Sequence, residues 1–286
     1  MKIYRTIDEI RAFSQSQRKI GYTIGFVPTM GFLHKGHLSL IDIAKKQSDV
    51  VIVSIFVNPT QFGPNEDLAT YPRDVDRDIQ LCRQRNVGAL FLPSTDEYYY
   101  PDSSTWVIEN ELTKDLCGAS RPGHFRGVTT IVAKLFNSVL PDIAVFGEKD
   151  FQQAAVIKRM VRDLNFPVKI VTGPIVREKD GLAMSSRNKY LSDKERQNAL
   201  SISRSLSKIR NDVKNGLIKN TIEAINYIKQ KIEESDGIID YVKAVNPEDL
   251  TDKQVFSETT LIAVSAYFGN TRLIDNKLIN LKKTEE

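Results

Sequence analysis

Cysteine is scarce in this chain of 286 residues: Cys82 and Cys117 are the only two, and they form no CxxC pair. Two unpaired cysteines fit reduced thiols better than a disulfide framework, which predicts a cytoplasmic location. Long apolar runs are missing as well, since no stretch approaches the ~20 apolar residues that span a bilayer. Residues 1–5 lead into a helical pattern and lack the apolar core of a signal peptide. We therefore expect a soluble protein without a membrane partner.

An excess of one charge is also missing. The net charge is only +4, and the Lys and Arg residues are spread along the chain. Without a basic stripe, charge alone does not predict a nucleic-acid partner. Two familiar phosphate-binding motifs, GxxxxGK[ST] and GxGxxG, are absent too. Any nucleotide site must therefore be built from other residues.

Strand-length apolar runs alternate with helical patterns through the first two thirds of the chain. The nearly continuous apolar run at 50–57 is typical of a strand that is covered on both faces. Further strands are expected at 22–27, 89–92, 143–146 and 168–171, and helices from the capping box Thr6–Glu9 and at 38–46, 75–85, 129–139 and 151–164. This alternation predicts an α/β fold with a doubly wound parallel sheet.

The pattern changes after about Arg177. The capping box Ser192–Glu195 opens a helix towards Lys214, and a second helix is expected over 221–234. Two strand-like runs follow, at 239–245 and 260–266. The chain is long for one domain. We predict a first domain at 1–176 and a smaller α+β domain at 177–286.

Two of the three histidines lie in the tetrapeptide His34-Lys35-Gly36-His37, between a predicted strand and a predicted helix. In a doubly wound sheet this position is the mouth of the nucleotide crevice. The amides and dipole of a helix N-terminus attract phosphate there, and imidazoles can add hydrogen bonds. The pair alone leaves three interpretations open: a phosphate site, a metal site that lacks its third ligand, or no function.

Two further segments carry charge in predicted loops. Gly147-Glu148-Lys149-Asp150 lies where a strand meets a helix, and Lys149 offers a cation to phosphate. Met184-Ser185-Ser186-Arg187 follows the predicted domain boundary, and its hydroxyls and guanidinium could hold phosphates. Each segment taken alone is equally consistent with an ordinary turn. Their convergence on one crevice is the stronger hypothesis.

Together with residues 28–31 and 56–62, these segments resemble the motif set of the pantothenate synthetase (pantoate–β-alanine ligase) family, in order and in spacing. The resemblance covers about Gly25 to Leu191. The His-x-Gly-His and Ser-Ser-Arg elements also resemble those of class I aminoacyl-tRNA synthetases and related nucleotidylyltransferases. The resemblance implies a Rossmann-like nucleotidylyltransferase fold whose C-terminal domain acts as a lid. It also implies ATP-dependent joining of pantoate to β-alanine through a pantoyl adenylate, with Mg²⁺ on the phosphates.

The resemblance also implies roles for particular residues. His34, His37, Lys149 and Arg187 would act in catalysis, with His37 as the family's proton donor. Gln61 and Gln153 would bind pantoate. The residues implied to line ATP are Met30, Gly31, Phe32, Leu33, His34, Lys35, Gly36, His37, Gly147, Glu148, Lys149, Asp150, Val176, Met184, Ser185, Ser186 and Arg187. No protein metal ligand is implied.

Other features of the resemblance are less specific. Arg121 and His124 could hold the β-alanine carboxylate or simply form a loop. Lys35 and Phe32 depart from the family pattern, which often has an acidic residue at 35 and a small or polar one at 32. A homodimer is expected by analogy, with residues 105–108 as an interface strand or an edge.

Two rival functions stay open at this point. One is a nucleotidylyltransferase that acts on a phosphorylated acceptor, which would favour more cationic acceptor groups than Gln61 and Gln153. The other is a non-catalytic ATP-binding or RNA-binding module. The complete set of His, Lys and Arg residues disfavours that module.

Overall fold

The computed structural model describes residues 1–64 and 66–281, which form two compact units. The first unit comprises Met1–Glu148 and Val156–Pro174, and the second comprises Lys149–Ala155 and the chain from Ile175 onward. The short segment 149–155 lies inside the predicted first domain. By its contacts, however, it belongs to the second unit.

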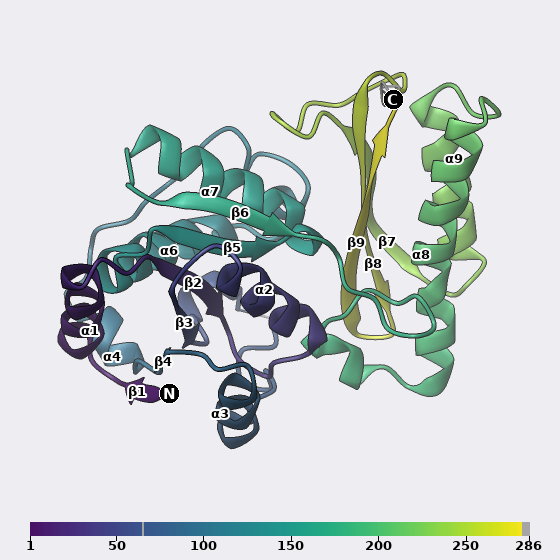
Figure 1. Cartoon of the computed structure of the whole chain (residues 1–286). Helices are drawn as coiled ribbons and strands as arrows, with labels where there is room; N and C mark the ends of the chain where they lie inside the picture. The colour runs from purple at the N-terminus through teal and green to yellow at the C-terminus, as the bar shows by residue number, and fades with distance from the viewer. Residues whose placement is uncertain (65, 282–286) are drawn as a thin grey trace. The chain divides into compact units, whose positions relative to one another are not determined.

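The first unit is built on a six-stranded sheet in which every pairing is parallel (Figure 1). Its order is β1-β4-β3-β2-β5-β6. The strands are β1 (Lys2–Tyr4), β2 (Ile24–Thr29), β3 (Val50–Ile55), β4 (Ala89–Phe91), β5 (Ile143–Gly147) and β6 (Lys169–Gly173). From β2 the chain adds β3 and β4 on one side, then returns to add β5 and β6 on the other. This confirms the predicted doubly wound sheet, and it puts the crevice at the carboxyl ends of β2 and β5.

Helices cover both faces of this sheet. They are α1 (Ile7–Lys19), α2 (Lys35–Lys45), α3 (Val75–Gln84), α4 (Thr95–Tyr98), α5 (Cys117–Ser120), α6 (His124–Val139) and α7 (Phe151–Asp163). Val145 of β5 lies in the same buried cluster as Leu38 of α2, whereas the Phe146 ring contacts Phe136 of α6. Because neighbours along a strand point to opposite faces, α2 and α6 lie on opposite sides of the sheet.

Local signals placed several helix starts correctly. In α1 the Thr6 hydroxyl accepts the Glu9 N–H at 3.3 Å, and the Glu9 carboxylate accepts the Thr6 N–H at 3.1 Å. The capping box is therefore confirmed. Helix α6 begins five residues before the predicted start at 129.

Residues 105–108 form no strand within the described chain, and the interface role expected for this segment stays a prediction. Instead, the Val107 N–H donates to the Thr130 hydroxyl at 3.0 Å, and the Thr129 hydroxyl donates to the Val107 carbonyl at 2.6 Å. Side chains of α6 satisfy the backbone groups that a neighbouring strand would otherwise bind.

The second unit packs two helices against a three-stranded antiparallel sheet, which confirms the predicted α+β character. Its elements are α8 (Asp193–Lys214), α9 (Thr221–Glu233), β7 (Ile238–Val245), β8 (Thr259–Phe268) and β9 (Thr271–Asn280). Strand β9 was not predicted, because its centre carries Asp275 and Asn276, residues depleted in strands. The pair Gly269-Asn270 before it was the available hairpin signal.

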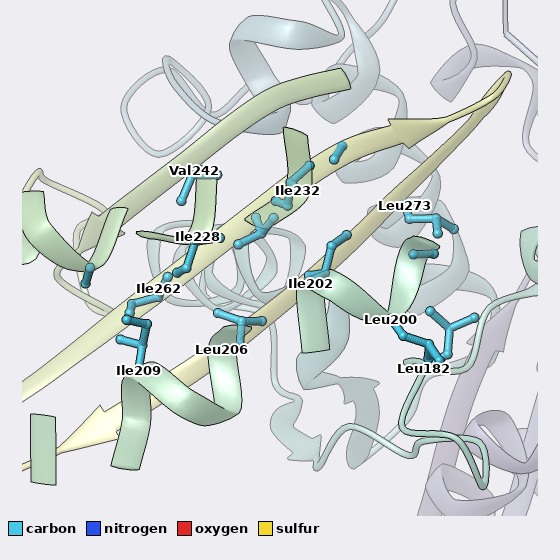
Figure 2. Packing of buried hydrophobic residues seen from close by; sticks show 14 of the residues in the cluster. Leu182, Leu200, Ile202, Leu206, Ile209, Ile228, Ile232, Val242, Ile262 and Leu273 are labelled. Atoms are coloured by element: carbon cyan, nitrogen blue, oxygen red, sulfur yellow. The ribbon is translucent and has the colours of Figure 1, made fainter. Parts of the chain in front are cut away.

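The core of the second unit lies between these helices and the sheet (Figure 2). Leu206 and Ile209 of α8 and Ile228 of α9 are almost fully buried, as is Ile262 of β8. Each such side chain stabilises the fold by about 1.5–3 kcal/mol. The second unit therefore has a hydrophobic core of its own.

Among the residues that the structure describes, no helix combines the length and apolarity that a membrane crossing requires. Cys82 and Cys117 are buried and form no disulfide. Burial, helped by the charge of Asp78, raises the pKa of the Cys82 thiol to about 12. That thiol stays protonated and is not a nucleophile.

Candidate active site

The chain passes from β2 into α2 through a tight loop at the crevice. Gly31 and Phe32 both have left-handed backbone conformations, with φ of 84° and 49°. A Cβ on Gly31 would lie 2.8 Å from the Ile55 side chain, so both the conformation and the space require glycine. All of Met30–His37 therefore lies at the carboxyl end of β2, where the strand order reverses.

His34 and His37 form the start of α2. Nδ1 of His34 accepts the N–H of Gly36 at 3.1 Å, and Nδ1 of His37 accepts the N–H of His34 at 3.3 Å. The two rings stack with centroids 4.0 Å apart. Because Nδ1 is an acceptor in both rings, each neutral imidazole carries its proton on Nε2. The helix N-terminus therefore combines two Nε2–H donors with its positive dipole end.

This arrangement distinguishes between the interpretations left open above. An imidazole that binds a metal through Nε2 must place its proton on Nδ1, where the backbone N–H groups already donate. Among the described residues, no group of three or more His, Cys, Asp or Glu side chains could hold a metal ion. With both Nε2–H groups at a helix N-terminus, the pair is suited to an anion such as phosphate.

Gln61 ends a 3₁₀ turn, Pro59–Gln61, at the carboxyl end of β3, and it is 9% exposed. Its Oε1 accepts the Nδ2–H of buried Asn58 at 3.1 Å, and its Nε2 lies 2.9 Å from the Met30 sulfur. The Oδ1 of Asn58 accepts the Tyr99 hydroxyl at 2.9 Å, so the Asn58 amide is oriented as well. These bonds make Nε2 the donor that Gln61 offers to a bound acceptor.

Arg121 and His124 converge on the backbone of Gln61. His124 Nδ1 lies 2.8 Å and Arg121 Nη2 lies 3.3 Å from the Gln61 carbonyl oxygen. Arg121 also forms a forked pair with the Glu66 carboxylate, with Nε at 2.7 Å from Oε1. Burial opposes the charge of Glu66, but the hydrogen bonds and charge of Arg121 lower the pKa of this carboxyl. The guanidinium considered for β-alanine is thus engaged by a carboxylate of the chain itself.

The second loop segment begins where β5 ends beside β2. Gly147 is the last residue of β5, and the Glu148 carboxylate accepts the Thr172 hydroxyl of β6 at 3.1 Å. Glu148–Asp150 form a 3₁₀ turn. The first unit therefore brings Gly147 and Glu148 to the same sheet edge as Met30–His37.

In the second unit, a hairpin joins Val176 to the Met184–Arg187 segment. The Met184 N–H donates to the Val176 carbonyl at 3.0 Å, and the Arg187 N–H donates to the Ser185 hydroxyl at 3.2 Å. Just beyond, Asn188 Nδ2 donates to the Glu178 carboxylate at 2.8 Å and closes the loop across the hairpin. Two segments assigned to ATP from separate parts of the sequence thus form one structure.

Lys149, Asp150 and Gln153 also belong to the second unit. The Lys149 carbonyl accepts Nδ2–H of Asn276, on β9, at 2.9 Å. The neighbouring Asp275 binds Arg177 of the hairpin at 2.6 and 2.9 Å. Adjacent residues of β9 therefore hold the backbone of Lys149 and the base of the hairpin.

Sequence reasoning missed several of these supporting residues. Asn58 lies inside the motif 56–62 but received no role, and Asp275 and Asn276 lie in the unpredicted strand. Asp78 of α3 was missed as well. A polar residue at an otherwise buried position of a helix or strand was the one available signal.

The chain was compared with known proteins. The family model for pantoate-beta-alanine ligase matches residues 2–278. The pantothenate synthetase of Thermotoga petrophila is 54% identical over 281 residues, covering 98% of this chain and 100% of that protein. That of Acetivibrio thermocellus is 49% identical over 282 residues, with coverage of 98% and 100%.

Solved structures agree with this result. The chain matches pantothenate synthetase from Thermus thermophilus with a TM-score of 0.91 and 42% identity, covering 98% of this chain and 100% of that one. It matches a pantoate-beta-alanine ligase from Francisella tularensis, complexed with beta-gamma ATP and beta-alanine, with a TM-score of 0.82 and 36% identity. That match covers 97% of each chain.

Proposed function

Because this chain belongs to the pantoate-beta-alanine ligase family, we propose that it condenses (R)-pantoate with β-alanine and ATP to give pantothenate, AMP and pyrophosphate. The observation that carries this proposal is the loop at the β2–β5 crevice. There His34 and His37 carry their protons on Nε2 at a helix N-terminus. At the carboxyl end of the neighbouring strand β3, the Gln61 amide is fixed as a donor.

In the first step, a pantoate carboxylate oxygen attacks the α-phosphorus of ATP. The bond from this phosphorus to the bridging oxygen breaks, and pyrophosphate leaves with the electron pair. We assign the charge on the leaving phosphates to hydrogen bonds from the Nε2–H groups of His34 and His37. The proton-donor role that the family implies for His37 is here hydrogen-bond donation, because a neutral imidazole keeps its Nε2 proton. Lys149 and Arg187 supply further positive charge.

The segments proposed to line ATP are 30–37, 147–150, Val176 and 184–187. Nitrogen donors and helix amides in these segments suit a triphosphate, because anions bind where N–H groups and dipoles converge. The Met184 to Val176 hydrogen bond supports treating the last two segments as one element.

Pantoate offers two hydroxyls and a carboxylate, so it needs neutral donors as well as a nearby cation. Gln61 and Gln153 are assigned to it. Since Asn58 holds the Oε1 of Gln61 and one Nε2–H donates to the Met30 sulfur, the other Nε2–H can donate to a pantoate oxygen. Pro28, Met30 and Phe62 are proposed as apolar neighbours of the pantoate methyl groups.

In the second step, the β-alanine amine attacks the acyl carbon of pantoyl adenylate. The bond from this carbon to the phosphate oxygen breaks, AMP leaves, and the nitrogen loses its extra proton as the amide forms. No covalent bond to the protein is needed. The chain's contribution is to position the reactants and to exclude water from the mixed anhydride.

Several assignments complete the proposal. Mg²⁺ is expected to enter with the ATP phosphates, since the described residues contain no metal-binding cluster of three or more His, Cys, Asp or Glu. We propose a nucleotide- and pantoate-binding domain at 1–176 and a C-terminal domain at 177–286 that acts as a lid. The second unit also includes residues 149–155. A cytoplasmic homodimer is proposed from the family.

The test is to supply ATP and Mg²⁺ with pantoate, with and without β-alanine. Pantoate-dependent exchange of pyrophosphate into ATP, and AMP release that requires β-alanine, are the expected results. Lys149→Ala should slow the exchange, and unchanged exchange in that variant would remove Lys149 from the first step.

The same assay separates the rivals. A nucleotidylyltransferase would transfer the nucleotide to a phosphorylated acceptor and ignore pantoate. A binding module would bind ATP, yet no acid would provoke turnover. Either outcome would replace the proposed function.

A further inference from the structure

Asp78 is a buried carboxylate of α3 that is bonded to the loop before His34. Its side chain is 1% exposed, although α3 follows the loop by more than forty residues. Oδ2 accepts the Phe32 N–H and Oδ1 accepts the Leu33 N–H, both at 2.7 Å. The two carboxylate oxygens thus accept hydrogen bonds from two consecutive backbone N–H groups of one turn. Hydrogen bonds to a charged acceptor are typically this short.

The turn that receives these bonds is strained. Phe32 has φ of 49°, a conformation that side-chain-bearing residues rarely adopt. The guanidinium of Arg77 lies 5.4 Å from the centre of the Phe32 ring. Adjacent residues of α3 therefore hold both the ring and the amide of the strained residue.

One side of this turn borders a cavity. Gly31, Phe32 and Asp78 line this pocket of about 270 Å³. Burial raises the pKa of the Asp78 carboxyl, while its bonds to the amides of Leu33 and Phe32 oppose that rise. A buried carboxylate is retained here despite the unfavourable desolvation.

We propose that Asp78 is a positioning residue, which holds Phe32 in its left-handed conformation and thereby sets His34 and His37 at the N-terminus of α2. If the turn relaxes, the N–H of His34 moves away from Nδ1 of His37. The imidazoles then lose the bonds that fix their protons on Nε2. The catalytic consequence rests on the proposed function, whereas the effect on the loop does not.

The primary variant is Asp78→Asn, which keeps the shape but replaces one acceptor by a donor. Its matched control is Asp76→Asn, the same change at an exposed position of the same helix. We expect Asp78→Asn to lower kcat/KM for ATP at least tenfold in pantoate-dependent exchange, and Asp76→Asn to change it less than twofold. Amide hydrogen exchange at residues 32 and 33 should accelerate in Asp78→Asn alone.

A second background separates positioning from general loss of stability. Glycine adopts positive φ readily, so Phe32→Gly removes the strain that Asp78 opposes. In the Phe32→Gly background, the factor by which Asp78→Asn lowers kcat/KM for ATP should be at least threefold smaller. A purely structural role would leave the loss the same in both backgrounds, and that result would overturn the proposal.

Two further outcomes are defined in advance. If Asp78→Asn does not fold, the same comparison is made with Asp78→Glu, which keeps the charge but displaces the oxygens by one methylene. Unaltered amide exchange at 32 and 33 in the folded variant would also refute the inference. Failure of the proposed function is recognised separately, because the unaltered protein would then show no pantoate-dependent exchange.

Discussion

Gly127 of α6 allows the helix to lie directly against the backbone that carries Gln61. A Cβ built on Gly127 would lie 2.4 Å from the Thr60 carbonyl oxygen and 2.7 Å from the Gln61 nitrogen. The carbonyl of Gly127 itself accepts Nδ2–H of Asn58 at 3.1 Å. The substitution Gly127→Ala must therefore displace the 3₁₀ turn that positions the Gln61 amide.

The size of the displacement follows from these distances. The oxygen must move from 2.4 Å to at least 3.0 Å, the shortest approach that real Cβ atoms show, which is a shift of about 0.6 Å. A displacement of about 1 Å at a reacting group can cost ~10²-fold in rate. We therefore expect kcat/KM for pantoate to fall about ten- to a hundredfold.

Stability should change much less than activity. Replacing a helical glycine by alanine stabilises by about 1 kcal/mol, whereas overpacking costs about 1–3 kcal/mol. The free energy of unfolding should therefore fall by no more than about 2 kcal/mol, which leaves the protein folded in the assay.

The measurement is pantoate-dependent pyrophosphate exchange as a function of pantoate and ATP concentration, with urea unfolding of the same samples. Gly63→Ala is the control, because among the described residues a Cβ there would come no closer than 3.7 Å, to the Glu66 side chain. We expect Gly63→Ala to behave like the unaltered protein. If Gly127→Ala retains normal kcat/KM for pantoate, the close approach of α6 does not position Gln61 and this reasoning is refuted.

Three further predictions concern charged and polar groups. His37→Ala should lower single-turnover adenylate formation at least ~100-fold, and full activity would reject the assigned role. Arg121 lowers the pKa of the Glu66 carboxyl. The stability that this carboxylate contributes is therefore present above the ordinary glutamate pKa of 4.5 and is lost as the pH falls below that value. The thermal unfolding temperature of Glu66→Gln should therefore fall less in acid than that of the unaltered protein. Asp275→Ala should leave Arg177 without its partner and lower the free energy of unfolding in urea by about 3 kcal/mol.

The last two predictions have matched controls. Glu111 forms an exposed ion pair with Lys114, and Glu111→Gln should leave the acid sensitivity unchanged. Asp236 pairs with Lys194 at the surface, where solvent screens the charges, so Asp236→Ala should destabilise the protein far less than Asp275→Ala. The Glu66 prediction is contradicted if Glu66→Gln and the unaltered protein are equally sensitive to acid. The Asp275 prediction is contradicted if Asp275→Ala and Asp236→Ala lower the free energy of unfolding equally.

Local patterns were enough to predict the class of fold. The alternation of apolar runs and helical periods indicated a doubly wound sheet, because burial on both faces constrains each strand independently of its partners. The capping boxes at Thr6 and Ser192 were read correctly for a similar reason, since both partners lie within four residues. The position of His34–His37 after β2 also followed from the order of elements.

The geometry of the candidate site required the tertiary structure. No local pattern connects Asp78 to the amides of Phe32 and Leu33, or Asn58 to the Gly127 carbonyl. Arg121 illustrates the same limit, since the sequence offered a guanidinium for a substrate carboxylate, and the fold pairs it with Glu66.

The sequence by itself therefore determined most of the helices and strands, the place of the loop 34–37 after β2, and which family the residues resemble. The tertiary structure alone decided which nitrogen of each imidazole carries the proton, which end of the Gln61 amide donates, and that β9 holds the backbone of Lys149. The physical reason is the separation along the sequence of the residues that interact. Periodicity and capping depend on residues a few positions apart, whereas a buried hydrogen bond depends on which distant segment the fold brings within about 3 Å.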